Sequence, residues 1–214
     1  INQDDIAIKR EAMIAAKEPL HVWSPNWGGD GFASDRFRGL LADLTRNLRI
    51  NFSSPRILLL GAGGAARGAL GPLLELKPRL LVVSNRTAER AIEIAEDFAY
   101  LGPVSGCQFA KLENQRFDLI VNATSASLRG DVPAIPPGVV DSLTTCYDMA
   151  YGSGDTAFVT WAKARGAGRA EQGWGMLVEQ AAEAFFLWRG VRPDTAPVLA
   201  ALRARSIRAS RSPS

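Results

Sequence analysis

The fold of this chain is decided by residues 56–70, which read RILLLGAGGAARGAL. The apolar run RILLL lies between a proline and a glycine, which is typical of a short buried strand, and a helical pattern extends from Ala65 to about Glu75. The turn between them, GAGGAA at residues 61–66, matches the pattern G-x-G-x-x-G/A. A strand, a glycine-rich turn and a helix in this order predict a dinucleotide-binding unit of the Rossmann type.

The glycines of this turn have steric and electrostatic reasons to be there. Gly61 permits a tight turn, and Gly63 and Gly64 let the backbone approach a pyrophosphate closely. The free N–H groups at the start of the following helix favour the negative charge of that group. The alternative is a turn that joins strand and helix and binds no ligand. The cofactor-binding residues predicted here are Gly61, Ala62, Gly63, Gly64 and Ala65.

The end of the second apolar run, residues 80–84, indicates which dinucleotide is bound. A site for NAD usually has Asp or Glu at this point, whereas this chain continues with Asn85, Arg86 and Thr87. The guanidinium of Arg86 can bind a 2′-phosphate, which a carboxylate would repel, and Arg90 one helical turn further on can add charge. We therefore predict NADP as the cofactor, held here by these four residues. The alternative for Arg86 is a solvated residue at a helix start.

The remaining chain continues the alternation of strands and helices. Two more apolar runs, residues 117–121 and 144–148, each end in polar residues, which would gather at the carboxyl edge of a parallel sheet. The predicted fold class is α/β, a Rossmann-type doubly wound, mainly parallel sheet. Further helices are expected at residues 38–49, 88–99, 176–190 and 193–205, the last after a cap at Asp194.

Composition excludes several other classes of protein. The 214 residues carry a net charge of only +3, and the basic residues are dispersed, so no nucleic-acid partner is expected. No apolar run approaches the length of a membrane span, and no signal peptide is evident, so we expect no membrane contact and a cytoplasmic location. Cys107 and Cys146 lack metal-site spacing and are expected to be buried apolar residues. The single histidine, His21, rules out a cluster of imidazole ligands and is expected in a loop.

Several motifs together resemble one family. The segments GAGGAARG, SNRT, NATS, YDMAY and GWGMLVEQAAEAFFLWRG occur in the order and roughly the spacing found in shikimate dehydrogenases. The resemblance extends from about Gly39 to Arg203. It implies reduction of 3-dehydroshikimate to shikimate by NADPH, without a metal, in the shikimate pathway of aromatic amino-acid and chorismate biosynthesis. We expect a monomer or homodimer.

The resemblance also implies roles for single residues. Met149 and Gly173 would lie on the nicotinamide side of the cofactor, and Tyr151 and Gln180 would contact the small-molecule substrate. Each has a plainer alternative by residue type: Met149 could be ordinary core, Tyr151 a packed aromatic, and Gln180 a surface residue of a helix.

The first part of the chain departs from the family pattern. In this family, a lysine in N-V-T-V-P-x-K and an aspartate in D-N-T-D-G form the catalytic pair, and neither motif is intact here. Lys9 and Asp35 are the residues that match best, and they are the predicted catalytic residues. The S-x-S and A-V-N-T segments have no counterpart. We predict a remnant of a smaller N-terminal substrate-binding and catalytic lobe at residues 1–38, an NADP-binding domain with C-terminal helices at 39–205, and a disordered tail at 206–214.

Two other functions stay open at this point. A catalytically inactive NADP-binding module would bind NADP without turnover, because half of the substrate pocket has no matching motif. A quinate/shikimate dehydrogenase would differ in substrate preference, and the Asn85–Arg86 pair argues mildly against NAD-using members of that kind.

Overall fold

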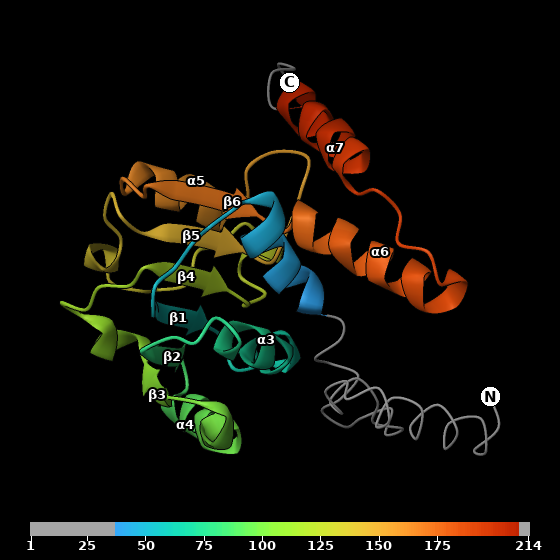
Figure 1. Ribbon diagram of the computed structural model, residues 1–214. Coiled ribbons are helices and arrows are strands. Elements are labelled where there is room, and N and C mark those ends of the chain that lie inside the picture. Colours follow the sequence, from blue (N-terminus) through green and yellow to red (C-terminus); the bar gives the residue numbers. More distant parts are fainter. Residues whose placement is uncertain (1–36, 210–214) are drawn as a thin grey trace.

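The computed structural model describes residues 37–209, with side chains described up to residue 204 (Figure 1). Within these residues the chain forms one sheet of six parallel strands in the order β3-β2-β1-β4-β5-β6. The strands are β1 (Arg56–Leu60), β2 (Leu80–Asn85), β3 (Val104–Gln108), β4 (Leu119–Asn122), β5 (Thr145–Asp148) and β6 (Arg169–Gln172). This strand order confirms the predicted doubly wound parallel sheet.

Helices cover both faces of the sheet. Residues 37–42 are α-helical and continue into the π-helical turn η2 (Asp43–Asn47), and together they are called the first helix below. The other helices are α3 (Gly64–Leu74), α4 (Ala88–Phe98), α5 (Ala157–Ala164), α6 (Trp174–Arg189) and α7 (Ala196–Ala209). Short 3₁₀ turns are η3 (Ala99–Leu101), η4 (Phe109–Leu112), η5 (Ser127–Arg129) and η6 (Pro137–Val139).

The central strands are apolar on both faces because each face has its own core. Ile57 and Leu59 of β1 point into a core with the first helix, α3, α4 and Met176 of α6. Leu58 and Leu60 point the opposite way, into a core with Phe158 of α5 and the chain before β5. Strands buried on both faces read as continuous apolar runs, which is why RILLL was recognisable as a strand.

Three elements of the structure were not predicted from the sequence: strands β3 and β6 and helix α5. The composition of the two strands explains why they were missed. β3 reads VSGCQ and β6 reads RAEQ, and both are edge strands with half-buried or exposed residues. Pairing with β2 and β5 places these segments in the sheet, although their own residues carry little strand signal.

The C-terminal part of the chain follows its capping residues. Helix α6 ends where Gly190 adopts the left-handed conformation (φ 69°), and Asp194 Oδ1 accepts the N–H of Ala196 at the start of α7, as predicted. The expected disordered tail at 206–214 begins too early, because α7 continues to Ala209. Residues 206–209 contain no glycine or proline and so do not end the helix.

The first helix and α6 cross in close contact. A Cβ atom on Gly175 would lie 1.8 Å from Asp43 Oδ1, and one on Gly39 would lie 2.5 Å from the carbonyl oxygen of Met176. Any side chain at either position would therefore push the helices apart. The crossing fixes how the first helix sits beside α6 and α3, at the carboxyl end of the sheet (Figure 1).

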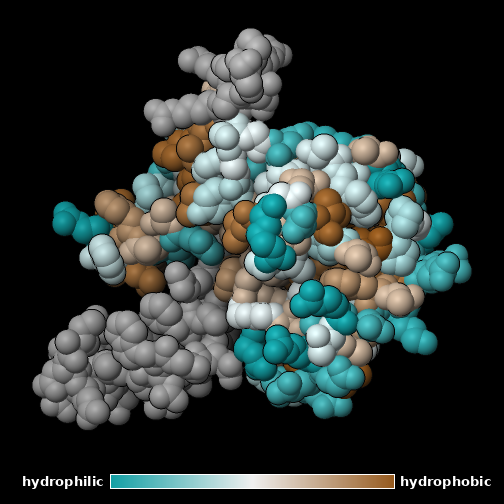
Figure 2. Space-filling view, turned by 180° about the vertical axis from the view of Figure 1, so that it is seen from behind, coloured by the Kyte–Doolittle hydropathy of each residue, from teal (hydrophilic) through white to brown (hydrophobic). Residues whose placement is uncertain are grey.

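Exposed apolar side chains gather on the far end of α6, and Figure 2 shows them as brown atoms on this projecting part. They include Phe185, Leu187 and Trp188.

Among the helices within residues 37–209, none has the length and apolar character needed to cross a membrane. Cys146 is buried as expected, burial raises the pKa of its thiol to about 12, and Cys107 is only half-buried.

Candidate functional site

The turn between β1 and α3 lies at the carboxyl edge of the sheet. Gly61 has a φ of 106°, a conformation that side chains other than glycine rarely adopt, and its N–H donates to the carbonyl of Ser84 at 2.8 Å. A Cβ atom at Gly61 would also lie 3.2 Å from the carbonyl oxygen of Ala123. Both facts make glycine necessary here for the fold itself.

Gly63 and Gly64 have a different surrounding. Both are exposed, and a Cβ atom on either would meet no protein atom within 4 Å among the described residues. Gly63 is the N-cap of α3, where none of the described side chains accepts a hydrogen bond from the helix, and the first turn holds no acidic residue. The open space and the uncapped N–H groups leave the start of α3 free for an anionic ligand.

The end of β2 presents positive charge beside this turn. Arg86, Thr87 and Arg90 are exposed, and among the residues whose side chains are described neither arginine forms an ion pair. The backbone here is held from two sides: Asn85 Nδ2 donates to the carbonyl of Thr87 at 3.1 Å, and Gln108 Nε2 of β3 donates to the carbonyl of Arg86 at 3.2 Å. Arg86 therefore extends from a turn with a fixed backbone, and Arg90 from the first turn of α4.

Met149 and Gly173 come together in the structure. The N–H of Gly173 donates to the carbonyl of Ala150 at 3.0 Å, and a Cβ atom on Gly173 would lie only 2.5 Å from the carbonyl oxygen of Met149. Met149 is 7% exposed and packs in the core that contains Tyr147 and Met176. The structure thus brings together two of the four residues that the resemblance placed next to nicotinamide and substrate.

A buried carboxylate organises the strand ends under these residues. Asp148 accepts hydrogen bonds from Ser127 Oγ and Thr156 Oγ1, both at 2.6 Å, and from Asn122 Nδ2 and the N–H of Ala150, both at 3.1 Å. Burial raises the pKa of this carboxyl, and the hydrogen bonds partly offset that rise. The four bonds tie β4, η5 and the start of α5 to the residue that precedes Met149.

Tyr151 and Gln180 lie on different elements. Tyr151 follows β5, is 42% exposed, and packs its ring against Trp174 with 4.8 Å between ring centroids. Gln180 lies on α6, seven residues after Gly173, and its Cγ would be 2.7 Å from a Cβ atom on Gly39 of the first helix. Its half-buried side chain therefore lies against the helix crossing, unlike an ordinary surface residue.

Two family models match this chain. The model of shikimate / quinate 5-dehydrogenase matches residues 43–129, and that of the shikimate 5′-dehydrogenase C-terminal domain matches residues 173–203. A shikimate dehydrogenase (NADP(+)) from Dechloromonas aromatica (strain RCB) is 52% identical over 198 residues, which are 92% of this chain and 71% of that protein. The chain belongs to the shikimate dehydrogenase family.

Further relatives show how much of a shikimate dehydrogenase this chain represents. A shikimate dehydrogenase (NADP(+)) from Hahella chejuensis (strain KCTC 2396) is 55% identical, over 77% of this chain and 61% of that protein. The structure of an Ael1 enzyme from Pseudomonas putida has a TM-score of 0.72 at 45% identity, and the match covers 78% of this chain and 62% of that one. The shikimate 5-dehydrogenase of Thermus thermophilus, solved in complex with NADP(H) and shikimate, has a TM-score of 0.65 at 30% identity, covering 80% of this chain and 62% of that one. This family member therefore spans about three fifths of the length of several of these proteins.

The predicted catalytic pair of this shikimate dehydrogenase family member stays a prediction. Lys9 and Asp35 lie outside the described residues, as do His21 and nearly all of the expected N-terminal lobe. The first helix begins to be described at residue 37, two residues after Asp35, and it lies at the crossing with α6 that also borders Gln180.

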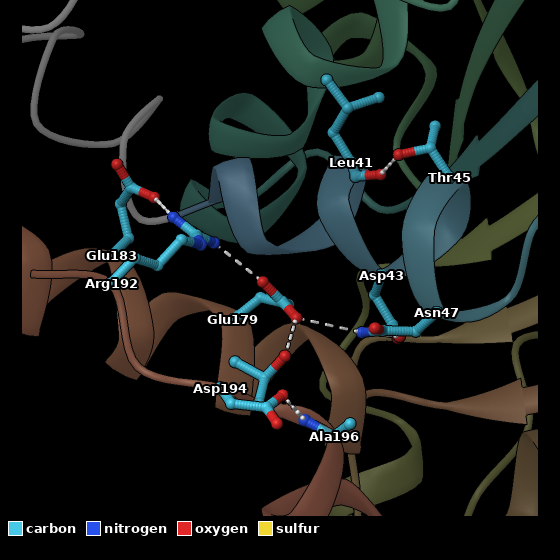
Figure 3. Close-up of polar contacts among 10 residues, drawn as sticks. Leu41, Asp43, Thr45, Asn47, Glu179, Glu183, Arg192, Asp194 and Ala196 are labelled. Carbon is cyan, nitrogen blue, oxygen red and sulfur yellow. Dashed lines mark hydrogen bonds and ion pairs between the residues drawn. The ribbon is translucent and has the colours of Figure 1, made fainter.

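A second buried carboxylate was missed by reasoning from the sequence. Glu179 Oε1 accepts from Thr195 Oγ1 at 2.8 Å and from Asn47 Nδ2 at 3.3 Å, and its Oε2 accepts from Arg192 Nη2 at 2.8 Å (Figure 3). Arg192 also pairs with Glu183. Burial alone would raise the pKa of the Glu179 carboxyl, but these hydrogen bonds outweigh it, and the pKa is lowered. This cluster joins the first helix, α6 and the chain between α6 and α7, one residue before Gln180.

The sequence held a partial signal for these buried acids. Asp148 ends an apolar strand within the segment YDMAY, so its place at the sheet edge was foreseeable, although its four partners were not. Glu179 sits in an amphipathic helix, where a glutamate usually indicates a solvated face. Only the tertiary position of Asn47 and Arg192 makes it a buried acceptor.

Proposed function

We propose that this chain supplies the NADP-binding part of a shikimate dehydrogenase, an oxidoreductase that reduces 3-dehydroshikimate to shikimate with NADPH. The observation that carries the proposal is the pairing of an open, uncapped glycine turn after β1 with a β2 end that offers arginine in place of an acid. The names of the relatives from Dechloromonas aromatica and Hahella chejuensis, shikimate dehydrogenase (NADP(+)), support it. So does the structure from Thermus thermophilus with NADP(H) and shikimate.

The residues at the edge of the sheet fit the proposed cofactor. Gly61 to Ala65 would hold the pyrophosphate, because the backbone at Gly63 and Gly64 faces open space and no described side chain accepts from the N–H groups at the start of α3. Asn85, Arg86, Thr87 and Arg90 would hold the 2′-phosphate, because this stretch has two exposed arginines that form no ion pair among the described side chains.

The residues beyond β5 would border the reacting part of the site. NADPH, when bound, supplies the hydride. Met149 and Gly173 would lie beside the nicotinamide. Any side chain at Gly173 would collide with the carbonyl oxygen of Met149, so glycine permits the close approach of these two segments. Tyr151 and Gln180 would bind hydroxyl or carboxylate groups of the substrate, since one is partly exposed and the other lies against the first helix.

The proton that a reduced ketone requires would come from the first part of the chain. We assign this role to Lys9, with Asp35 as its carboxylate partner, in a lobe of residues 1–38 that precedes the NADP-binding domain of residues 39–205. Location in the cytoplasm and a monomeric or homodimeric state belong to the same proposal. Size-exclusion chromatography with light scattering tests the oligomeric state.

The experiment that tests the function combines turnover and binding on one preparation. NADP reduction is followed at 340 nm with shikimate and, in parallel, with quinate, while NADP affinity is measured by calorimetric titration. Turnover with shikimate that is lost in Lys9→Ala, with NADP affinity unchanged, is the expected result. Binding without turnover would instead identify a catalytically inactive NADP-binding module, and faster turnover of quinate would identify a quinate/shikimate dehydrogenase.

Gln180 offers a separate test of the substrate side. Gln180→Ala is expected to raise the KM for shikimate while leaving the Kd for NADP nearly unchanged, because Gln180 lies on α6 and packs against Gly39, whereas the pyrophosphate turn joins β1 to α3. A loss of NADP affinity with an unchanged KM for shikimate would contradict the assignment.

A further inference from the structure

The loop after β5 carries Tyr151 and is held by side chains from the next strand and helix. Gln172 is the last residue of β6, and its amide uses both ends on this loop. The N–H of Gly152 donates to Gln172 Oε1 at 3.0 Å, and Gln172 Nε2 donates to the carbonyl of Gly154 at 3.2 Å. An amide that both accepts and donates fixes the loop backbone on either side of residue 153.

Trp174 holds the ring of Tyr151 itself. The two rings lie with centroids 4.8 Å apart and an interplanar angle of 41°, a tilted arrangement in the range that aromatic pairs favour. The indole Nε1 is buried and has no hydrogen-bond partner among the described residues. The contact between Trp174 and Tyr151 is therefore one of ring faces and edges, and it does not depend on the indole N–H.

The surroundings make these two contacts important for Tyr151. Tyr151 is 42% exposed, and the ring of Trp174 is its aromatic neighbour. Gln172 and Trp174 also line a cavity of about 350 Å³ between β6, α5 and α6, together with Asp155, Gly175 and Arg203. Because Gln172 and Trp174 are themselves partly exposed to this cavity, their contacts with the loop are the ones that removal of either side chain would take away.

We infer that Gln172 and Trp174 are positioning residues that orient Tyr151 toward the substrate. This inference rests on the proposed function, in which Tyr151 contacts the substrate, and it adds two residues outside the roles assigned above. Gln172 fixes the backbone of the loop, and Trp174 fixes the ring. Gly173, proposed to lie beside the nicotinamide, is between them in the sequence. The segment 172–174 would therefore border both Tyr151 and the nicotinamide.

The test is a double-mutant cycle on the full chain with shikimate as the varied substrate. Trp174→Ala and Gln172→Met are each expected to raise the KM for shikimate about three- to tenfold, with smaller changes in kcat and in the Kd for NADP. In a Tyr151→Ala background, Trp174→Ala should have almost no further effect, because two residues that act through one contact are not additive. Full additivity of the two substitutions would overturn the inference for Trp174.

Conservative and control variants separate positioning from general loss of structure. Trp174→Phe should have a KM for shikimate close to that of wild type, because the ring contact does not use the indole N–H. Gln172→Glu should be intermediate, since a carboxylate accepts from Gly152 but cannot donate to Gly154. Gln115→Met is the matched control, because Gln115, between η4 and β4, also donates to one carbonyl, that of Lys111, and accepts from one donor, Arg56. An equal KM rise in that control would overturn the inference.

A failure of the proposed function would look different. If the wild-type chain binds NADP but does not oxidise shikimate, the assignment of the substrate fails. Amide hydrogen exchange still tests the clamp, by which we mean the two hydrogen bonds of Gln172 with Gly152 and Gly154. Exchange at Gly152 should become faster in Gln172→Met and stay unchanged in Gln115→Met. If Gly152 exchanges equally fast in wild type and Gln172→Met, the clamp itself is contradicted.

Discussion

The phenol of Tyr147 donates a hydrogen bond of 2.7 Å to Asp43 Oδ2, and both side chains are almost completely buried. The bond joins β5, the strand next to the edge strand β6, to the first helix. Asp43 has one other side-chain donor among the described residues, Asn47 Nδ2 at 3.0 Å. Burial raises the pKa of the Asp43 carboxyl, with the bond from Tyr147 acting against that rise.

Removal of the Tyr147 hydroxyl group should destabilise the protein, although it deletes only one oxygen atom. Tyr147→Phe leaves a buried carboxylate oxygen without its donor, which costs about 1–3 kcal/mol in the free energy of unfolding. Urea unfolding followed by circular dichroism measures the change. Tyr100→Phe, at an exposed tyrosine, serves as the control and should change the free energy of unfolding very little. Equal stability of Tyr147→Phe and wild type would show that the hydrogen bond does not hold the first helix.

Two glycines of the same turn should respond to alanine in opposite ways. Gly63→Ala meets no protein atom and adopts an ordinary backbone conformation, so stability should stay close to that of wild type while NADP affinity falls about tenfold or more through contact with the pyrophosphate. Gly61→Ala must accept a φ of 106° and should lower the melting temperature. Calorimetric titration and thermal unfolding measure the two properties. Unchanged NADP affinity in Gly63→Ala would contradict the site.

Arg86 should determine the choice between the two dinucleotides. Arg86→Ala is expected to weaken NADPH binding about 10- to 100-fold, the effect of losing a charge-assisted hydrogen bond, while NADH binding changes little. Arg165→Ala, at an exposed arginine that ends α5, is the control. Equal losses for NADPH and NADH would mean that Arg86 does not contact the 2′-phosphate.

The cluster around Glu179 should make stability depend on pH. Its pKa in the folded chain lies below the ordinary value of 4.5, so its ionised form stabilises the fold above that pH, and this contribution is lost as the pH falls through the lowered pKa. Glu179→Gln keeps the shape and loses the charge that Arg192 pairs with, and should cost about 1–3 kcal/mol at pH 7. The difference from wild type should shrink between about pH 5 and pH 3. A difference that stays constant over that range would contradict the role of the charge.

How well the sequence predicted each element depended on where its residues are buried. Strands β1, β2, β4 and β5 are almost entirely buried and were recognisable, whereas β3 and β6 are edge strands that pairing alone defines. The tight turn at Gly61 and the exposed arginine after β2 were foreseeable because local sequence determines them, and their roles in binding a cofactor stay predictions. Glu179, Gln172 and Trp174 were not, because their partners lie on segments that only the folded chain brings near.

The single helix α6 links the proposed cofactor and substrate ends of the site. Gly173 caps its start and Gln180 follows seven residues later, which in an α-helix is about two turns and about 10 Å, so both face the same side. One inserted residue between them would turn Gln180 by about 100° away from that side. If both residues have their proposed roles, the number of residues between them matters to the site as much as their identity, whereas α6 beyond Gln180 is free of that constraint.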